Sequence, residues 1–216
     1  MKTRIIPIVS ATALILGSGA ALAETSAKAM TDLNLRAGPG PMFKIVDVIE
    51  ADETVTVTGC VETADWCKVV LEDQEGWSYA PYLKVEGTEA PLEEVAKAQS
   101  VAVVEFTDKS DEAALVSGGI GAIAGALIAG PAGAVAGGVL GGVAGDLAVK
   151  PEVKVYAAEH PVEPVILNGE VVVGAKVPND VTVYEMPEFA EYAYLNVNGD
   201  TVIIDSDTRK IVDILR

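Results

Sequence analysis

The sequence is poor in histidine, cysteine and basic residues, and each shortage excludes a class of function. His160 is the only histidine, so a zinc site built on several histidines cannot form. A Cys–His catalytic pair is also excluded if the two cysteines are joined to each other. No G-x-S-x-G nucleophile motif is present. These gaps predict a protein that is not an enzyme and that holds no metal ion and no cofactor.

Basic residues are outnumbered, with 15 lysines and arginines against 32 acidic residues and a net charge of −17. So acidic a chain repels the phosphates of nucleic acids and anionic lipid headgroups. We therefore expect no nucleic-acid partner, and any partner attracted by charge should be cationic. The alternative is that the acidity only keeps an exported protein soluble.

Residues 1–23 have the parts of a secretory signal peptide. Lys2 and Arg4 supply a positive start, an apolar run follows, and Ala21-Leu22-Ala23 matches an A-x-A cleavage site. No cysteine lies near that site, so we expect no lipoprotein anchor. The sequence predicts an exported protein of the periplasm or cell envelope whose mature chain begins near Glu24.

The two cysteines, Cys60 and Cys67, lie in a segment with the pattern of a β-hairpin. Val55 and Val57 alternate with threonines before the first cysteine, and residues 62–65 form a polar turn. In an exported protein such a pair favours a disulfide. The alternative of a metal-binding or redox pair lacks both the C-x-x-C spacing and a nearby histidine. We therefore predict a disulfide between Cys60 and Cys67.

Residues 116–147 are built almost entirely from glycine, alanine and aliphatic residues. Small residues recur every fourth position, so a helix would have one smooth face, which carries Gly121, Gly125, Gly133, Gly137, Gly141 and Gly145. Smooth faces let helices associate closely in lipid, where the helix also satisfies its own backbone groups. We predict a glycine zipper that contacts a membrane or joins copies of the chain into a homo-oligomer. The alternative is a flexible Gly/Ala linker.

Pro131 determines the expected shape of this glycine-rich segment. Gly130-Pro131 suits the end of one helix and the first turn of the next. Two helices of about 15 residues would each span about 22 Å, which is less than the roughly 30 Å hydrocarbon core of a bilayer. The sequence therefore favours a helical hairpin over residues 116–147, with a single kinked span as the alternative.

Residues 27–86 contain short alternating runs separated by turn residues, the pattern of a small all-β domain. Four motifs follow one another along it: Leu33-Asn34-Leu35-Arg36-Ala37-Gly38-Pro39-Gly40, Trp66-Cys67-Lys68-Val69, Gly76-Trp77 and Tyr82-Leu83. In order and spacing these motifs resemble the bacterial SH3 (SH3b) domain. The resemblance implies an SH3-like β-barrel of five to seven strands. It also implies a role beside peptidoglycan or its peptides, which domains of this family often bind.

A candidate ligand groove lies within this domain and comprises Asn34, Arg36, Trp66, Tyr79 and Tyr82. Aromatic rings with one polar edge are common in binding grooves. Arg36 could pair with a carboxylate of a ligand. Two alternatives remain open: Arg36 pairs with one of the many acids on the surface of the protein, and Tyr82, like Trp77, fills the barrel core.

A linker over residues 87–115 leads from this domain into the glycine zipper, and a third unit follows over residues 150–216. The linker contains a helix-like piece at 92–99 and an apolar run at 101–106. In the third unit we expect strands over 153–156, 164–167 and 170–173, and then a three-stranded antiparallel meander. The meander should comprise residues 192–197, 201–205 and 211–215, with turns at Asn198-Gly199 and at Ser206 to Arg209.

The C-terminal unit carries a series of motifs in order: Val177-Pro178 to Met186-Pro187, Tyr194 to Asn198-Gly199, Val202 to Asp205, and Thr208-Arg209 with Ile211-Val212. In these motifs it resembles a bacterial family called domain of unknown function 1236, for which no activity is implied. A looser likeness to small periplasmic metal-homeostasis proteins lacks the ligand residues that those proteins would need. The fold class expected for the whole chain is mainly β: an SH3-like barrel, a helical hairpin and a small antiparallel β domain.

These features support one main hypothesis and two alternatives for the function. The first is a non-catalytic envelope protein whose SH3b module binds a peptide or wall component such as peptidoglycan and which the zipper tethers or oligomerises. The second is a structural or stress-related periplasmic protein with no small ligand. The third is a cation-binding homeostasis protein that uses its acidic surface.

Overall fold

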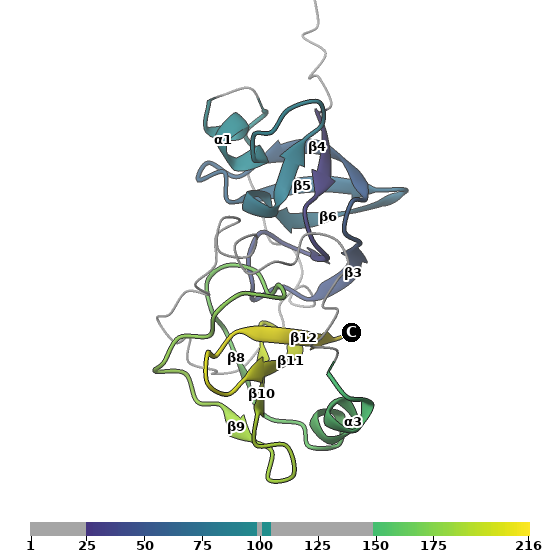
Figure 1. The fold of residues 1–216 in the computed structure, drawn as a ribbon. Helices are drawn as coiled ribbons and strands as arrows, with labels where there is room; N and C mark the ends of the chain where they lie inside the picture. The colour runs from purple at the N-terminus through teal and green to yellow at the C-terminus, as the bar shows by residue number, and fades with distance from the viewer. Residues whose placement is uncertain (1–24, 99–100, 105–148) are drawn as a thin grey trace, which may run out of the picture.

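The computed structural model describes residues 25–98, 101–104 and 149–216, which form two β-sheets with two short α-helices (Figure 1). The predicted signal peptide, the glycine zipper with its six spaced glycines and most of the segment leading into it lie outside these residues. Among the described residues, no helix has the length and apolar character to cross a membrane. The mainly β fold class predicted from the sequence is confirmed.

The N-terminal sheet has seven strands in the order β3-β2-β6-β5-β4-β1-β7. Its elements are β1 (Thr25–Ala29), β2 (Leu33–Arg36), β3 (Ile45–Ile49), β4 (Thr54–Cys60), β5 (Trp66–Leu71), β6 (Gln74–Tyr79), the 3₁₀ turn η1 (Ala80–Tyr82) and β7 (Leu83–Val85). Alternating side chains point to opposite faces of the sheet: Val55 and Val57 of β4 are buried, while Thr56 between them is partly exposed. The short runs expected within residues 27–86 are thus strands, as β4 illustrates.

Gly76 brings β2 and β6 unusually close together. A Cβ atom at this position would lie 2.5 Å from Cγ of Leu35 and 3.0 Å from the carbonyl oxygen of Arg36. Only a residue without a side chain fits such an approach. The crossing places Arg36 opposite Trp77 of β6, at the end of the sheet that faces the second sheet.

The predicted disulfide between Cys60 and Cys67 is confirmed, and it closes the β4–β5 hairpin. Beyond the end of β1, the edge of β4 is paired with residues 101–104 instead. Cys60 N donates to the Ala102 carbonyl, and Val104 N donates to the Cys60 carbonyl, each at 2.8 Å. The helix-like piece of the linker is α1 (Leu92–Lys97), whose Leu92 is buried in the core.

The C-terminal sheet contains the predicted meander, formed by β10 (Tyr192–Val197), β11 (Asp200–Asp205) and β12 (Ile211–Leu215). Two short strands complete it, β8 (Pro164–Val165) and β9 (Tyr184–Glu185), both of which pair with β10. Asn198 and Gly199 have φ values of 54° and 97°, which is the left-handed geometry that a two-residue hairpin turn requires.

Two of the expected strands in this part of the chain were wrong. Residues 153–156 belong to helix α3 (Pro151–Glu159), because Pro151 occupies a first-turn position and Val153 and Ala157, four residues apart, are both buried. Their apparent alternation is only four residues long, and Val155 is 52% exposed. Residues 170–173 form an irregular segment rather than a strand, and the strand expected at 164–167 ends at Val165.

The apolar core is continuous across the two sheets. Leu33, Leu35 and Tyr82 of the first sheet belong to the same buried cluster as Leu167, Val171 and other residues of the C-terminal part. A smaller cluster lies between α3 and the other face of the C-terminal sheet, where Val153, Met186 and Ile203 meet. The two sheets therefore share one hydrophobic core, and the residues between them are removed from water.

Candidate functional site

Arg36, at the end of β2, lies at the centre of the contact between the two sheets. Its side chain is fully buried, with 0% exposure. Nε donates to Oε2 of Glu170 at 2.9 Å, and Nη2 donates to Oε1 of the same carboxylate at 2.8 Å. This two-point contact is the fork geometry that arginine forms with carboxylates. The pair joins residues 134 positions apart in the sequence.

The remaining guanidinium nitrogen of Arg36 is held by backbone carbonyls from both sheets. Nη1 donates to the Phe43 carbonyl at 2.9 Å, to that of Asn198 at 3.0 Å and to that of Pro41 at 3.2 Å. The loop between β2 and β3 presents two of these carbonyls because the Phe43 ring packs directly on Gly38, where a Cβ would lie 2.5 Å from the ring. Arg36 thus has hydrogen-bond acceptors for all three of its nitrogen atoms.

Glu170 is brought to Arg36 by two Asn-Gly turns of the C-terminal part. Gly169, with φ of 96°, turns the chain just before Glu170, and Asn198 of the β10–β11 turn accepts from Leu167 N at 2.8 Å. The amide of Asn198 also reaches the Gly169 carbonyl at 3.3 Å. Glu170 is 1% exposed, and its Oε1 accepts from Val171 N at 2.8 Å. Its carboxylate is therefore bound within its own part of the chain as well as by Arg36 of the first sheet.

Asn34 adds a second donor to this cluster. One hydrogen of its amide goes to Oε1 of Glu170 at 3.0 Å and the other to Oδ2 of Asp200 at 2.8 Å. Its own Oδ1 is buried and accepts no hydrogen bond from the described residues. Asp200 is 4% exposed, and burial raises the pKa of its carboxyl above the usual value. The cluster thus holds two carboxyl groups around one guanidinium.

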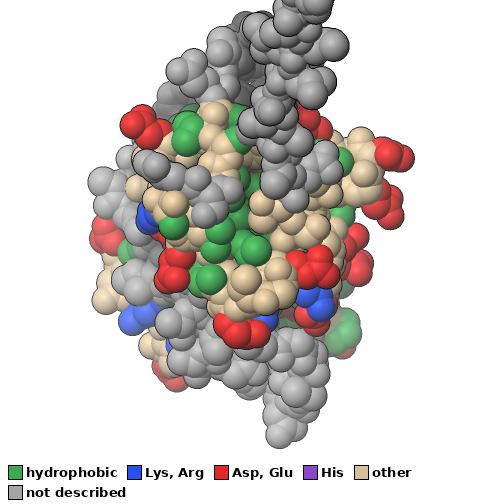
Figure 2. Space-filling model, turned by 90° about the horizontal axis from the view of Figure 1, so that it is seen from above, with side chains coloured by type: hydrophobic (Ala, Val, Ile, Leu, Met, Phe, Trp, Pro, Cys, Tyr) green, Lys and Arg blue, Asp and Glu red, His purple; other side chains and the backbone are tan. Residues whose placement is uncertain are grey.

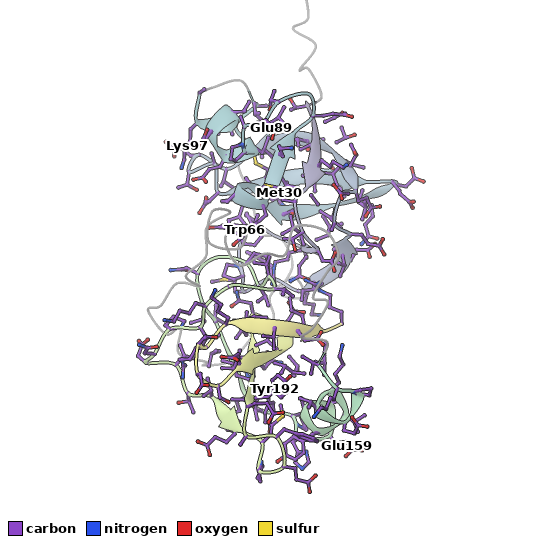
Figure 3. The ribbon with its side chains drawn as sticks, in the orientation of Figure 1. Met30, Trp66, Glu89, Lys97, Glu159 and Tyr192 are labelled. Carbon is purple, nitrogen blue, oxygen red and sulfur yellow. A yellow bond between two sulfur atoms is a disulfide. The ribbon has the colours of Figure 1, made fainter. Side chains whose placement is uncertain are left out.

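Three aromatic residues of the predicted groove lie next to each other. The ring centres of Trp66 and Tyr79 are 5.3 Å apart, and those of Tyr79 and Tyr82 are 6.0 Å apart. Trp66 appears at the end of the N-terminal sheet nearer the second sheet (Figure 3). Burial raises the pKa of both tyrosines, and the charge of Glu170 contributes to each shift. The tyrosines therefore lie within electrostatic range of the Arg36–Glu170 pair.

The structure thus divides the five predicted groove residues into two neighbouring sets. Asn34 and Arg36 bind the carboxylate of Glu170 directly, whereas Trp66, Tyr79 and Tyr82 pack on one another. Trp66 and Tyr82 are 5% and 2% exposed, whereas Tyr79 is partly exposed. Of the two alternatives considered for Arg36, the structure contains the pairing with an acid of the chain, although that acid is buried rather than on the surface.

The sequence reasoning missed Glu170, Asp200 and Asn198. A signal for two of them was present, because each carboxylate directly follows an Asn-Gly pair, at 168–170 and at 198–200. The two pairs differ in backbone geometry, because both Asn198 and Gly199 have a positive φ whereas only the glycine does at 168–169, but each precedes an acid of the cluster. Nothing in either triplet indicates that its acid will meet Arg36.

A separate acidic hollow of about 800 Å³ lies on the N-terminal sheet. It is lined by Asp47, Val48, Glu50, Glu53, Leu71, Glu72, Asp73, Gln74 and Glu75. Figure 2 shows acidic side chains spread over the rim of the face seen from above, with few basic ones. Within the described ranges, no group of three or more potential ligands is arranged to hold a metal ion.

Comparison with known families covers two parts of the chain. The model of the bacterial SH3 domain matches residues 31–84, and the model of a domain of unknown function, DUF1236, matches residues 156–216. No curated protein and no solved structure gave a significant match. Both resemblances drawn from the sequence motifs are confirmed. Arg36 and Asn34 belong to the first domain and Glu170 and Asp200 to the second, so the chain carries a bacterial SH3 domain and a DUF1236 domain that meet at this cluster.

Proposed function

We propose that this chain is an exported, non-catalytic protein of the cell envelope whose SH3 domain binds a peptide or another component of the cell wall. The observation that carries the proposal is the bacterial SH3 match over residues 31–84, since a bacterial SH3 domain is typically a binding module. The disulfide between Cys60 and Cys67 supports a location outside the cytoplasm, where such bonds persist.

The predicted signal peptide and glycine zipper extend this proposal. Cleavage after Ala23 would release the chain into the periplasm, and the segment 116–147 would tether it to a membrane or join copies of it. The net charge of −17 supports a partner that is neutral or cationic rather than an anionic polymer.

A structural role without a small ligand is the second candidate, and the buried cluster favours it. Arg36 and Asn34, two of the five groove residues, are occupied by Glu170 in this structure. In this alternative the SH3 surface serves only to hold the DUF1236 domain.

Retention on purified peptidoglycan sacculi separates the two candidates. The proposal expects the purified chain to sediment with the sacculi and expects Tyr79→Ala to reduce the bound fraction at least tenfold. Tyr79 is the predicted groove residue with the most accessible side chain, so its loss removes the part of the aromatic surface that a ligand can reach. Tyr184→Ala, at an exposed tyrosine of the DUF1236 domain, is the matched control and should bind as the unmodified chain does. No retention, or equal retention by both variants, would contradict the proposal.

A further inference from the structure

The Arg36 site has the composition of a carboxylate receptor. A guanidinium fork reaches both oxygens of one carboxylate at 2.9 and 2.8 Å, and the Asn34 amide donates to one of the same oxygens at 3.0 Å. Charge-assisted bonds with this geometry are among the strongest that proteins use to recognise carboxylates and phosphates. These three side-chain donors come from the SH3 domain, and the carboxylate comes from the DUF1236 domain, whose Val171 N also donates to it.

A second observation indicates that Glu170 leaves one hydrogen-bond acceptor of this site without a donor. Oδ1 of Asn34 is buried in a residue of 0% exposure, yet no described residue donates a hydrogen bond to it. A buried acceptor left without a donor costs about 1–3 kcal/mol. A side-chain carboxylate is an acceptor only, so Glu170 has no hydrogen with which to satisfy this atom.

We propose that Asn34 and Arg36 form a subsite for the terminal carboxylate of a peptide, and that Glu170 occupies this subsite as an internal substitute for that ligand. A peptide terminus carries both groups that the site calls for. Its carboxylate takes the place of the Glu170 carboxylate on Arg36, and the N–H of its last amide donates to Oδ1 of Asn34. This inference rests on the proposed function, for which it specifies the class of ligand.

Tyr79 and Tyr82 give the subsite a direction. The ring centres of Tyr82 and Tyr79 are 6.0 Å apart and those of Tyr79 and Trp66 are 5.3 Å apart. Tyr79 lies on β6, the strand that pairs with β2 at Arg36. A peptide whose terminus is bound at Arg36 would therefore continue along the aromatic rings. Tyr79 is the most accessible of the three, which makes this the side from which the peptide enters.

Replacing the Glu170 carboxylate on Arg36 by a peptide carboxylate costs little free energy. Moving Glu170 out of the buried site costs more. The ion pair itself is replaced by an equivalent one, and a buried pair adds little net stability over its desolvation cost. Val171 and Val172, next to Glu170, are fully buried in the shared core and must shift with it. The apparent affinity of the unmodified chain is therefore lowered by the small fraction of molecules in which the subsite is open.

Two model peptides test the subsite directly: N-acetyl-Ala-Ala with a free carboxylate, and the same peptide as its C-terminal amide. Glu170→Ala removes the internal substitute, so it should bind the acid at least tenfold more tightly than the unmodified chain does. It should also bind the acid at least tenfold more tightly than the amide. Glu163→Ala, at an exposed glutamate of the same domain, is the matched control and should behave as the unmodified chain. A Glu170→Ala protein that folds but does not gain affinity, or gains it equally for the amide, would overturn the proposal.

A measurement on the unmodified chain covers the case in which Glu170→Ala does not fold. The ¹⁵N–¹H resonance of Arg36 Nε reports its hydrogen bond to Glu170. Millimolar acid peptide should shift this resonance, whereas the amide at equal concentration should leave it in place. An unchanged resonance with both peptides would refute exchange at this site.

The peptide-binding test of the subsite and the sacculus test of the proposed function can fail independently of each other. If the chain is retained on sacculi but binds the acid and amide peptides equally well, the subsite is overturned and wall binding is left intact. If the chain binds the acid peptide selectively but is not retained on sacculi, the subsite is supported, and the cell wall is contradicted as the source of its peptide ligand.

Discussion

At the scale of single residues, Arg36 determines how the two domains meet. Removing a guanidinium from water is costly, and the cost is recovered only where its hydrogens are satisfied. Here the Glu170 carboxylate and three backbone carbonyls supply the acceptors. The cluster nevertheless contains one more carboxyl group than it has guanidinium groups, because Asp200 shares the Asn34 amide with Glu170.

The excess carboxyl group gives the stability of the protein a predictable pH dependence. Burial raises the pKa of Asp200, and the charge of Glu170 raises it further, while the Asn34 hydrogen bond, Arg216 and Arg36 act in the opposite direction. The folded state thus holds this proton more tightly than the unfolded chain does. The contribution of Asp200 is fully present below the unfolded pKa and is lost as pH rises through the folded pKa. Asp200→Asn should therefore raise stability at pH 7 by about 1 kcal/mol, the lower end of the gain seen when buried ions are replaced.

Melting curves at pH 7 and pH 4 provide the measurement. The gain from Asp200→Asn should shrink as pH falls toward the unfolded pKa, near 4. Asp205→Asn is the contrasting control, since hydrogen bonds from Thr208 lower the pKa of Asp205 and its contribution is instead lost as pH falls. Asp205→Asn should then destabilise the protein at pH 7. An Asp200→Asn protein that is less stable at pH 7 would show that the cluster needs the second charge.

At the scale of elements, the β4–β5 hairpin has a backbone contact with residues 101–104 in addition to its disulfide. Its edge at Cys60 is paired with residues 101–104, so a sheet edge that would otherwise be open is covered by the chain itself. Gly59 makes this possible because a Cβ there would lie 2.5 Å from Cγ1 of Val104 and 2.9 Å from the Ala102 carbonyl. The absence of a side chain at one position thus allows a four-residue segment to dock.

Gly59→Ala should therefore displace residues 101–104 while leaving the barrel folded. The clash is with a backbone oxygen as well as a side chain, and overpacking of this kind typically costs about 1–3 kcal/mol. Hydrogen exchange at the Val104 amide, which donates to the Cys60 carbonyl, should accelerate at least tenfold. Gly40→Ala is the control, since its added Cβ would meet only ordinary contacts 3.6 Å away in the Phe43 ring. Unchanged protection of Val104 would mean that this pairing tolerates the extra methyl group.

At the scale of the whole molecule, local patterns predicted the elements well and the contact between domains poorly. The meander was predictable because alternation and an Asn-Gly turn agree over residues 192–205. Helix α3 was missed because Val153 to Tyr156 alternate by chance, whereas the helix is stabilised by burial of Val153 and Ala157 on the sheet. Such burial is a tertiary effect that overrides a four-residue pattern.

The candidate site shows the same limit. The SH3 motifs contain Asn34, Arg36, Trp66 and Tyr82, and the aromatic ring of Tyr79 added it to the candidate groove. The structure packs the three aromatic rings together and binds Asn34 and Arg36 to one carboxylate. The partner of Arg36 is 134 residues away among 32 acids, and neither charge nor spacing distinguishes Glu170 from the others. Glu170 is the partner of Arg36 because the segments at 168–170 and 198–200 pack against β2.

The central claim is that the Arg36–Glu170 cluster joins the two domains into one cooperative unit, and denaturant unfolding followed by tryptophan fluorescence tests it most directly. Both tryptophans, Trp66 and Trp77, lie in the SH3 domain, whereas Glu170 lies in the other. Glu170→Ala leaves Arg36 without its carboxylate, so the SH3 signal should unfold at lower denaturant, with a loss of about 3 kcal/mol. Glu163→Ala should leave the transition in place. An SH3 transition that is the same in Glu170→Ala and in the unmodified chain would contradict the account.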